Sequence, residues 1–232
     1  MTGRVHSVNV GRSGVNPARP NRATGIRKRP VDGPVEVRDP GPRRGGLGSG
    51  LAGDFIGDGK YHGGTDQAVY AFAREELDFW AQELGREIPD GSFGENLTLS
   101  GVDVDDARLG DVWRIGGVLL QVTDARIPCG TFRASMEVRG WLRRFTERGR
   151  SGAYLKVLEP GTLRAGLPVE LTRRAGHVVG VVDAFRAQTT ERHRMPELLR
   201  AGEDLCEQLR LRVEKEQRAA DRRDGRAATA LS

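Results

Sequence analysis

The spacing of apolar and polar residues predicts short strands across the first three quarters of the chain. Residues 4–10 alternate between the two classes, which is typical of a half-buried strand. Residues 11–24 are rich in Gly, Pro, Asn and Arg and predict a loop. Further strands are expected at residues 25–31, 33–38, 97–100, 110–115, 118–123, 153–158 and 169–171. Gly116-Gly117 is a favoured turn dipeptide and would join two of these strands as a hairpin.

Helical spacing occurs in two places before residue 175 and again near the end. Residues 66–87 place apolar side chains near the 3.6-residue period and predict a helix that Gly85 would stop. Residues 131–148 predict a second helix, which Gly140 would divide. Two further helices are expected at 195–200 and 203–217.

These elements predict a mainly β fold with helices, of the α+β class, in two parts. Residues 1–175 form the strand-rich domain, residues 176–218 form a small C-terminal helical region, and residues 219–232 lack an apolar period and predict a disordered tail. Residues 39–53 are rich in Gly and Pro and predict an irregular loop, for which a lid is one role.

Composition narrows the class of protein. The 232 residues contain no run of about 18 apolar residues, so no membrane-spanning helix is expected. The N-terminus lacks the apolar core of a secretory signal, and the two cysteines have no metal-type spacing and imply no disulfide framework. We therefore expect a cytoplasmic protein in a reducing compartment.

The net charge of +5 is concentrated at the start of the chain. Residues 1–50 hold ten Lys and Arg against three Asp and Glu. A nucleic-acid-binding protein is one interpretation, but this segment has no interleaved aromatic residues and no reading motif. The Arg excess is also what a genome rich in G and C produces, although Arg suits phosphate binding.

Cys129 follows a strongly apolar strand and precedes a helix, in the sequence Arg126-Ile127-Pro128-Cys129-Gly130. A thiol at a helix N-terminus is stabilised as thiolate, and Arg126 adds positive charge. A thiolate is a nucleophile or a ligand for a soft metal, whereas a buried structural thiol is the alternative. Cys206 lies among the leucines of a predicted helix and is interpreted as a packing residue.

Three other places offer polar groups for binding. His62-Gly63-Gly64 before a helix start is typical either of an anion cradle or of a capped turn. Glu95 and Asn96 place a carboxylate and an amide on a tight glycine turn. Lys28 lies in an extended basic segment, where it either meets phosphate or lies in solvent.

Taken in order, these segments resemble the MOSC domain, named after the C-terminal domain of molybdenum cofactor sulfurases, and in particular its YiiM-like bacterial branch. The likeness covers about residues 4–171 and is carried by five motifs: Gly53-Asp54, His62-Gly63-Gly64-Thr65-Asp66-Gln67-Ala68, Phe93-Gly94-Glu95-Asn96-Leu97, Leu109-Gly110-Asp111 and Arg126-Ile127-Pro128-Cys129. The segment around Pro40-Gly41-Pro42 is longer than expected for this branch. The resemblance implies a strand-rich barrel that binds the molybdenum cofactor, followed by a small helical region. It also implies reduction of N-hydroxylated compounds such as hydroxylaminopurine-type base analogues, a detoxifying activity.

The resemblance assigns roles to individual residues. Cys129 is the expected metal ligand, and the cofactor-binding residues are expected to be Lys28, His62, Gly63, Asn96, Arg126 and Cys129. Asp54 and Glu95 are expected to act with Cys129 in catalysis, by orienting neighbours or relaying a proton.

The partners expected are a small N-hydroxylated substrate and a separate electron-donor reductase. Two distant cysteines cannot hold an iron–sulfur cluster, so the electrons must come from another protein. A non-redox carrier of the cofactor, or of sulfur on Cys129, is the alternative function. The oligomeric state is left open, with a homodimer among the options.

Overall fold

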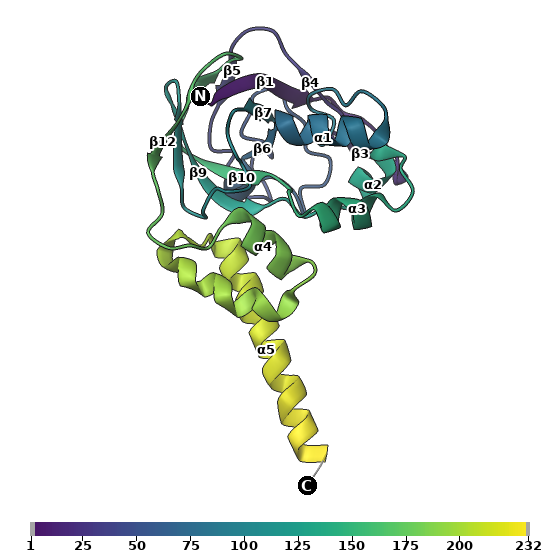
Figure 1. Cartoon of the computed structure of the whole chain (residues 1–232), viewed down its shortest axis with the longest axis vertical. Helices are drawn as coiled ribbons and strands as arrows, with labels where there is room; N and C mark the ends of the chain where they lie inside the picture. Colours follow the sequence, from purple (N-terminus) through teal and green to yellow (C-terminus); the bar gives the residue numbers. More distant parts are fainter. Residues whose placement is uncertain (1–2, 231–232) are drawn as a thin grey trace.

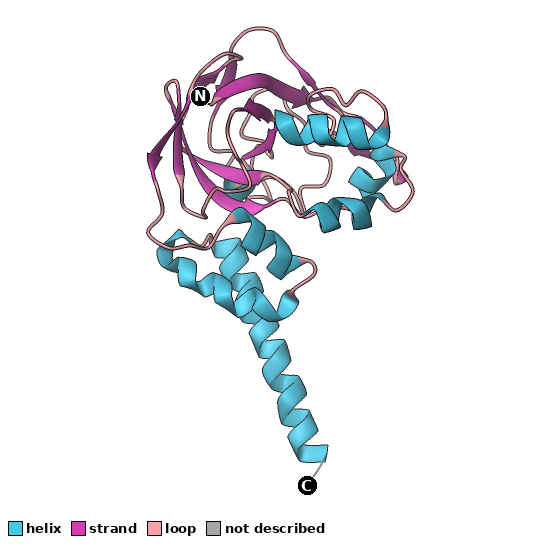
Figure 2. Ribbon diagram, in the orientation of Figure 1, coloured by secondary structure: helices cyan, strands magenta, loops and turns pink. Residues whose placement is uncertain are grey.

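The computed structural model describes residues 3–230 and consists of a curled sheet with helices on one side and at one end (Figures 1 and 2). The strands are β1 (Arg4–Gly11), β2 (Gly14–Asn16), β3 (Arg19–Thr24), β4 (Lys28–Pro30), β5 (Val35–Val37), β6 (Val69–Ala73), β7 (Leu97–Ser100), β8 (Val112–Ile115), β9 (Val118–Ala125), β10 (Ala153–Glu159), β11 (Gly161–Leu163) and β12 (Val169–Arg173). The helices are η1 (Thr65–Gln67), α1 (Arg74–Leu84), α2 (Gly130–Met136), α3 (Trp141–Arg148), α4 (Val181–Gln188), η2 (Arg192–Asp204) and α5 (Glu207–Ala230).

Eight strands form one sheet in the order β12-β8-β9-β10-β6-β7-β1-β4. Backbone hydrogen bonds also join the start of β1 to the segment that leads into β12, because Val5 N donates to Leu167 O at 2.9 Å and Gly166 N donates to Val5 O at 2.8 Å. The start of β1 therefore lies beside the start of the edge strand β12, and the strands curl around a common core. The strand-rich α+β fold predicted from the sequence is confirmed.

Two segments differ from the sequence expectation. Residues 11–24 are not a plain loop, because β2 and β3 form a hairpin. Nearly every residue of this hairpin is exposed, so its sequence shows no apolar alternation. The helix expected from residue 66 begins only at Arg74, because Val69–Ala73 is the strand β6. All five β6 residues are buried in the middle of the sheet, and a continuous apolar run does not distinguish a buried strand from a helix.

The division expected at Gly140 is confirmed and separates α2 from α3. Around these helices, aromatic side chains form a buried cluster. Phe93 lies 5.1 Å from Phe132 and 5.5 Å from Trp141 between ring centroids, with the rings edge to face. Offset and edge-to-face aromatic pairs add to the stabilisation from burial. The cluster fixes α2 against the sheet and so fixes Cys129, which caps its N-terminus.

The C-terminal helices α4, η2 and α5 pack against one end of the barrel, and α5 extends away from it (Figure 1). The backbone of residues 219–230 continues α5, where the sequence predicts a disordered tail, and residues 231–232 of that tail lie outside the described part. Within residues 3–230, no helix combines the length and the apolar character needed to cross a bilayer.

Candidate functional site

A cavity of about 410 Å³ opens where β9 ends and α2 begins. Its wall is built from the β2–β3 hairpin, the segment before η1, the 91–96 turn and the end of β9. The lining includes all six residues predicted to bind a cofactor, Lys28, His62, Gly63, Asn96, Arg126 and Cys129. Segments far apart in the sequence therefore meet around one space. Asp54 and Glu95 are outside this lining.

Cys129 is half-buried in the cavity wall, and its backbone is extended, with φ −122° and ψ 170°, just before α2. Burial alone would raise the pKa of its thiol, but a hydrogen bond from His62, the charge of Arg126 and the Phe132 N–H together lower that pKa to about 6. Each of these groups favours the negative sulfur. Cys129 is therefore a thiolate at neutral pH, as expected of a nucleophile or of a ligand for a soft metal.

Arg126 is a buried cation that lacks a full set of partners. Its side chain is 4% exposed, and its guanidinium carbon lies 3.9 Å from the centroid of the Phe132 ring. Its Nη1 atom is buried and finds no hydrogen-bond partner among the described residues. A buried charge without a partner is costly, and the cost is offset when an anion binds. The cavity thus offers an unmet positive charge beside the Cys129 thiolate.

Asp54 lies outside the lining and connects three residues that belong to it. Its carboxylate accepts a hydrogen bond from the Lys28 ammonium, one from Ser49 Oγ at 2.6 Å and one from Asn96 Nδ2 at 2.9 Å. The Asn96 amide is also held by the protein on its other side, because its Oδ1 accepts from Tyr70 N at 3.1 Å. Asp54 therefore orients Lys28 and Asn96.

Glu95 is fully buried beneath the 91–96 turn. Its two oxygens accept hydrogen bonds from Gly91 N at 2.5 Å and Phe93 N at 2.9 Å, and Oε1 also accepts from Thr98 Oγ1 at 3.2 Å. Burial raises the pKa of Glu95 to about 7, against the effect of these donors. In this structure its carboxylate fastens the turn that carries Asn96.

Gly63 and Gly64 are required by a close approach of two loops. Their φ values are +79° and +81°, and a Cβ on Gly63 would lie 2.4 Å from Gly48 O. The 39–53 segment therefore packs directly against the loop that presents His62. It is an irregular segment, as the sequence predicts, and its Ser49 reaches the cavity lining. The role of this segment as a lid stays a prediction.

Several lining residues were not expected to take part in the site, among them Gln67, Asp124, Tyr154 and Arg212. Asp124 carried a signal, because it is a carboxylate at the end of an apolar strand just before Arg126. Arg212 carried none, since it lies on α5 and reaches the cavity only through the packing of the C-terminal helices.

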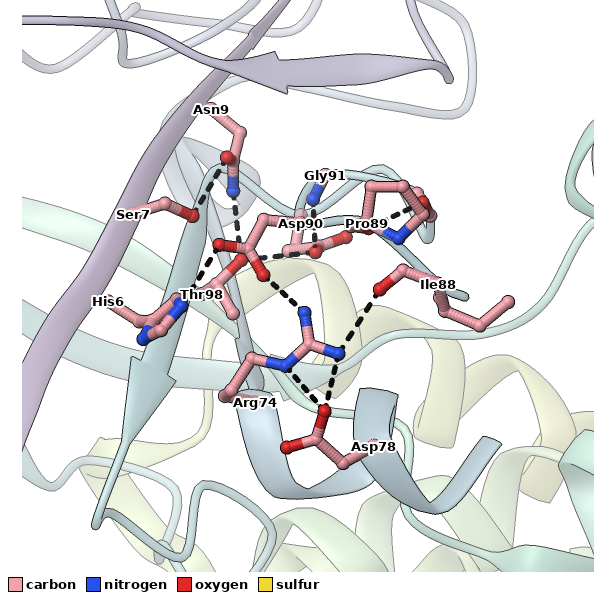
Figure 3. A network of polar contacts seen from close by, with 12 residues as sticks. His6, Ser7, Asn9, Arg74, Asp78, Ile88, Pro89, Asp90, Gly91 and Thr98 are labelled. Carbon is pink, nitrogen blue, oxygen red and sulfur yellow. Dashed lines mark hydrogen bonds and ion pairs between the residues drawn. The ribbon is translucent and has the colours of Figure 1, made fainter. Parts of the chain in front are cut away.

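A second hollow, of about 520 Å³, lies beside α1 and shows the opposite arrangement of charge. There Arg74 contacts both Asp78, at 2.8 Å, and Asp90, and it donates to Ile88 O at 3.1 Å (Figure 3). His6 lies 3.5 Å from the same Asp90. The Arg74 guanidinium is thus paired with two carboxylates of the hollow. Among the described residues that line this hollow, Arg74 is therefore not an unsatisfied buried cation, unlike Arg126 in the cavity at Cys129.

Comparison with known proteins identifies the family. The MOSC domain model matches residues 58–170. The chain is 32% identical to YflK of Bacillus subtilis (strain 168) over 167 residues, which is 70% of each protein. The chain belongs to the MOSC domain family. YiiM of Escherichia coli (strain K12) is 32% identical over 132 residues, 56% of this MOSC chain and 59% of YiiM.

The likeness extends beyond the conserved domain model. The crystal structure of YiiM from Geobacillus stearothermophilus superposes with a TM-score of 0.72 at 27% identity, over 92% of this chain and 98% of that one. An alignment over that share of the chain must pass residues 58 and 170 on both sides. The N-terminal strands that hold Lys28 and at least part of the C-terminal helices therefore belong to the shared fold.

Proposed function

We propose that this MOSC protein binds the molybdenum cofactor and reduces N-hydroxylated compounds with electrons from a separate reductase protein. The observation that carries the proposal is that one cavity holds both the Cys129 thiolate and Arg126, a buried cation whose Nη1 has no hydrogen-bond partner among the described residues. A soft sulfur ligand suits molybdenum, and a buried guanidinium suits the negative charge of a phosphate or dithiolene.

The metal-binding groups of the cavity fit a metal whose other ligands belong to its cofactor. Cys129 would contribute one sulfur, and no cluster of three or more His, Cys, Asp or Glu able to hold a metal ion occurs in the described part of the chain. Arg126, Lys28 and His62 line the same cavity and would meet the anionic part of the cofactor. Gln67 adds a buried Oε1 that has no hydrogen-bond partner among the described residues and would accept from the N–H groups of a pterin.

The chain's own residues bind and orient. His62 holds the Cys129 sulfur in its charged form, and Asp54 keeps Lys28 and Asn96 in place. The aromatic cluster excludes water behind Arg126, where electrostatic interactions are stronger. When bound, the cofactor would supply the two electrons that, together with two protons, convert R–NH–OH into R–NH₂ and water.

The test is the molybdenum and pterin content of the chain purified from a host that makes the cofactor. Near-stoichiometric molybdenum is expected in the wild type and in Cys206→Ser, and loss of the metal in Cys129→Ser. Loaded protein should then consume an N-hydroxylated substrate only when an electron-donor protein is present. Molybdenum retained by Cys129→Ser would overturn the ligand assignment. Cofactor bound without any turnover would support the alternative of a carrier.

A further inference from the structure

Asp124 is a buried carboxyl in the cavity wall that the proposed function leaves without a role. It lies near the end of β9, its side chain is 5% exposed, and it lines the cavity together with Cys129 and Arg126. Its Oδ1 accepts hydrogen bonds from Gln188 Nε2 at 2.6 Å and from Ala125 N at 2.7 Å. These are the two hydrogen bonds that the described residues donate to the Asp124 carboxyl, and both end on Oδ1. Oδ2 is therefore the oxygen left for a ligand.

The C-terminal helices hold Asp124 in this position. Gln188 is the last residue of α4, and its Oε1 accepts a hydrogen bond from the Arg212 guanidinium of α5. Arg212 itself reaches the cavity lining. A chain of hydrogen bonds thus runs from Arg212 on α5 through Gln188 on α4 to Oδ1 of Asp124.

Two carboxyl groups line the cavity, Asp58 and Asp124. His62 is hydrogen-bonded to the Cys129 sulfur, and Asp58 pairs with Arg22 at 3.6 Å. Burial raises the pKa of Tyr154 to about 12, which makes it a poor acid. Burial also raises the pKa of Asp124 to about 6, so a useful fraction of this carboxyl carries a proton.

We propose that Asp124 donates a proton to the oxygen that leaves an N-hydroxylated substrate, and that Gln188 and Arg212 are its positioning residues. The inference rests on the proposed function. Reduction of R–NH–OH breaks the N–O bond and needs two electrons and two protons. The electrons come from the cofactor, which the reductase protein recharges. Asp124 gives one proton to the leaving oxygen, which departs as water, and solvent supplies the proton on nitrogen and reprotonates Asp124.

Charged and titratable groups on several elements act on Asp124. After burial, the charge of Arg212 and the Gln188 hydrogen bond lower its pKa, and the charge of Asp66 next to η1 raises it. Tyr154 on β10 and Cys206 before α5 are also close enough to interact with its charge. A proton donor must be protonated to act, so the rate should fall as pH rises through the pKa of Asp124.

The first measurement needs no activity. Infrared difference spectra of the cofactor-free protein across pH 4–8 should show a carboxyl C=O band that disappears with a midpoint near 6 in the wild type. Asp105 titrates in the same range, with a pKa of about 6, so Asp124→Asn should lose part of this band, whereas Asp32→Asn, a matched change on an exposed turn, should keep all of it. The part of the band that Asp124→Asn loses should have its midpoint at higher pH in Arg212→Gln, because that variant lacks a positive charge that favours the carboxylate. A band of unchanged amplitude in Asp124→Asn would overturn the inference.

The second measurement is the pH profile of the loaded holoprotein with an aryl hydroxylamine and its electron donor. Asp124→Asn should lower kcat about 100-fold with KM and molybdenum content unchanged, because a general acid typically contributes that much. Arg212→Gln should shift the falling limb to higher pH. If the wild type reduces nothing, the proposed function fails and this inference fails with it. If the wild type turns over and Asp124→Asn matches it in rate and pH profile, only this inference is overturned.

Discussion

The two cysteines of this chain start from the same chemistry and are driven in opposite directions by their surroundings. Cys206 is buried and Cys129 is half-buried, and burial raises the pKa of a thiol. At Cys129 the His62 hydrogen bond and the Arg126 charge more than offset burial, and the pKa falls to about 6. At Cys206, burial together with the negative charges of Asp124 and Asp66 raises the pKa to about 12. Local charge, more than burial, decides whether a buried thiol of this protein is reactive.

The arginines show the same contrast between the cavity and the rest of the molecule. Arg126, in the cavity wall, has a buried nitrogen without a partner, whereas Arg74 has Asp78, Asp90 and a backbone carbonyl around it (Figure 3). A structural cation is satisfied by its own protein. A buried cation that lacks part of its hydrogen bonds has an unfavourable desolvation free energy, which an anionic ligand can offset. In this respect the cavity at Cys129 differs from the hollow beside α1.

The largest expected effect is on thiol reactivity. In the single-cysteine variants Cys206→Ser and Cys129→Ser, iodoacetamide at pH 7 should modify Cys129 at least about 100-fold faster than Cys206, because only Cys129 is largely thiolate at that pH. The Cys129 rate should rise with pH to half its maximum near 6. In denaturing urea the two rates should converge. Equal rates in the folded protein, or a Cys129 midpoint near the ordinary value of ~8.5, would remove the contrast.

The second expected effect is on the pH dependence of the free energy of unfolding, through the buried carboxyl of Glu95. The pKa of Glu95 is raised from 4.5 to about 7 by burial, so between these values folded protein holds a proton that the unfolded chain has released. Stability contributed by this group is therefore complete below pH 4.5 and is lost as pH rises through about 7. Glu95→Gln should remove on the order of 2 kcal/mol of this pH dependence.

Urea unfolding at pH 5 and at pH 7.5 measures the change. Asp105 and Asp124 also have pKa values raised to about 6 by burial, so the quantity to compare is the difference between wild type and variant. Glu170→Gln, an exposed change on β12, should keep the wild-type slope. A slope unchanged in Glu95→Gln would show that this carboxyl is ionised in the folded protein at both pH values.

The special environment of Cys129 could be predicted in part from the sequence, because some of the residues that create it are neighbours in the chain. The Cys129 environment was predictable because Arg126, Pro128 and the helix start are neighbours in the chain. The hairpin of β8 and β9 was predictable because Gly116-Gly117 fixes its turn, and the register places Ile115 opposite Val118 as expected. Short-range spacing is enough where the interacting groups are adjacent in sequence.

The rest depended on contacts between distant segments. The strand β6 is apolar on both faces because it lies in the middle of the sheet, and no period within five residues reveals that position. The β2–β3 hairpin is exposed on both faces and leaves no apolar pattern. Arg212 enters the site from α5, and its role depends on how the C-terminal helices dock. The sequence therefore predicted the centre of the site better than its walls.

The third effect sharpens the comparison of the arginines with one matched substitution. Arg74→Met should lower the free energy of unfolding by about 1–2 kcal/mol, because Asp90, with a side chain 11% exposed, loses its strongest partner. Arg126→Met should leave the free energy of unfolding unchanged or raise it, since removal of an unpaired buried charge offsets the lost contact with the Phe132 ring. Denaturant titration of the cofactor-free protein separates the two. An Arg126→Met loss as large as that of Arg74→Met would mean that Arg126 is structural.

The smallest expected effect is the contribution of His62 to the lowered pKa of Cys129. His62→Ala removes the hydrogen bond to the Cys129 sulfur, so the pKa of Cys129 should move upward from about 6 toward its ordinary range. A raised pKa leaves less thiolate at a given pH, and alkylation at pH 6 should slow by about fivefold for a pKa rise of about one unit. At pH 9, where the thiol ionises in both proteins, the rates should agree within a few-fold. His193→Ala, at an exposed position on η2, should leave the profile unchanged. A slower rate at both pH values would show that the substitution blocked access, and an unchanged midpoint would assign the lowered pKa to Arg126 and the Phe132 N–H alone.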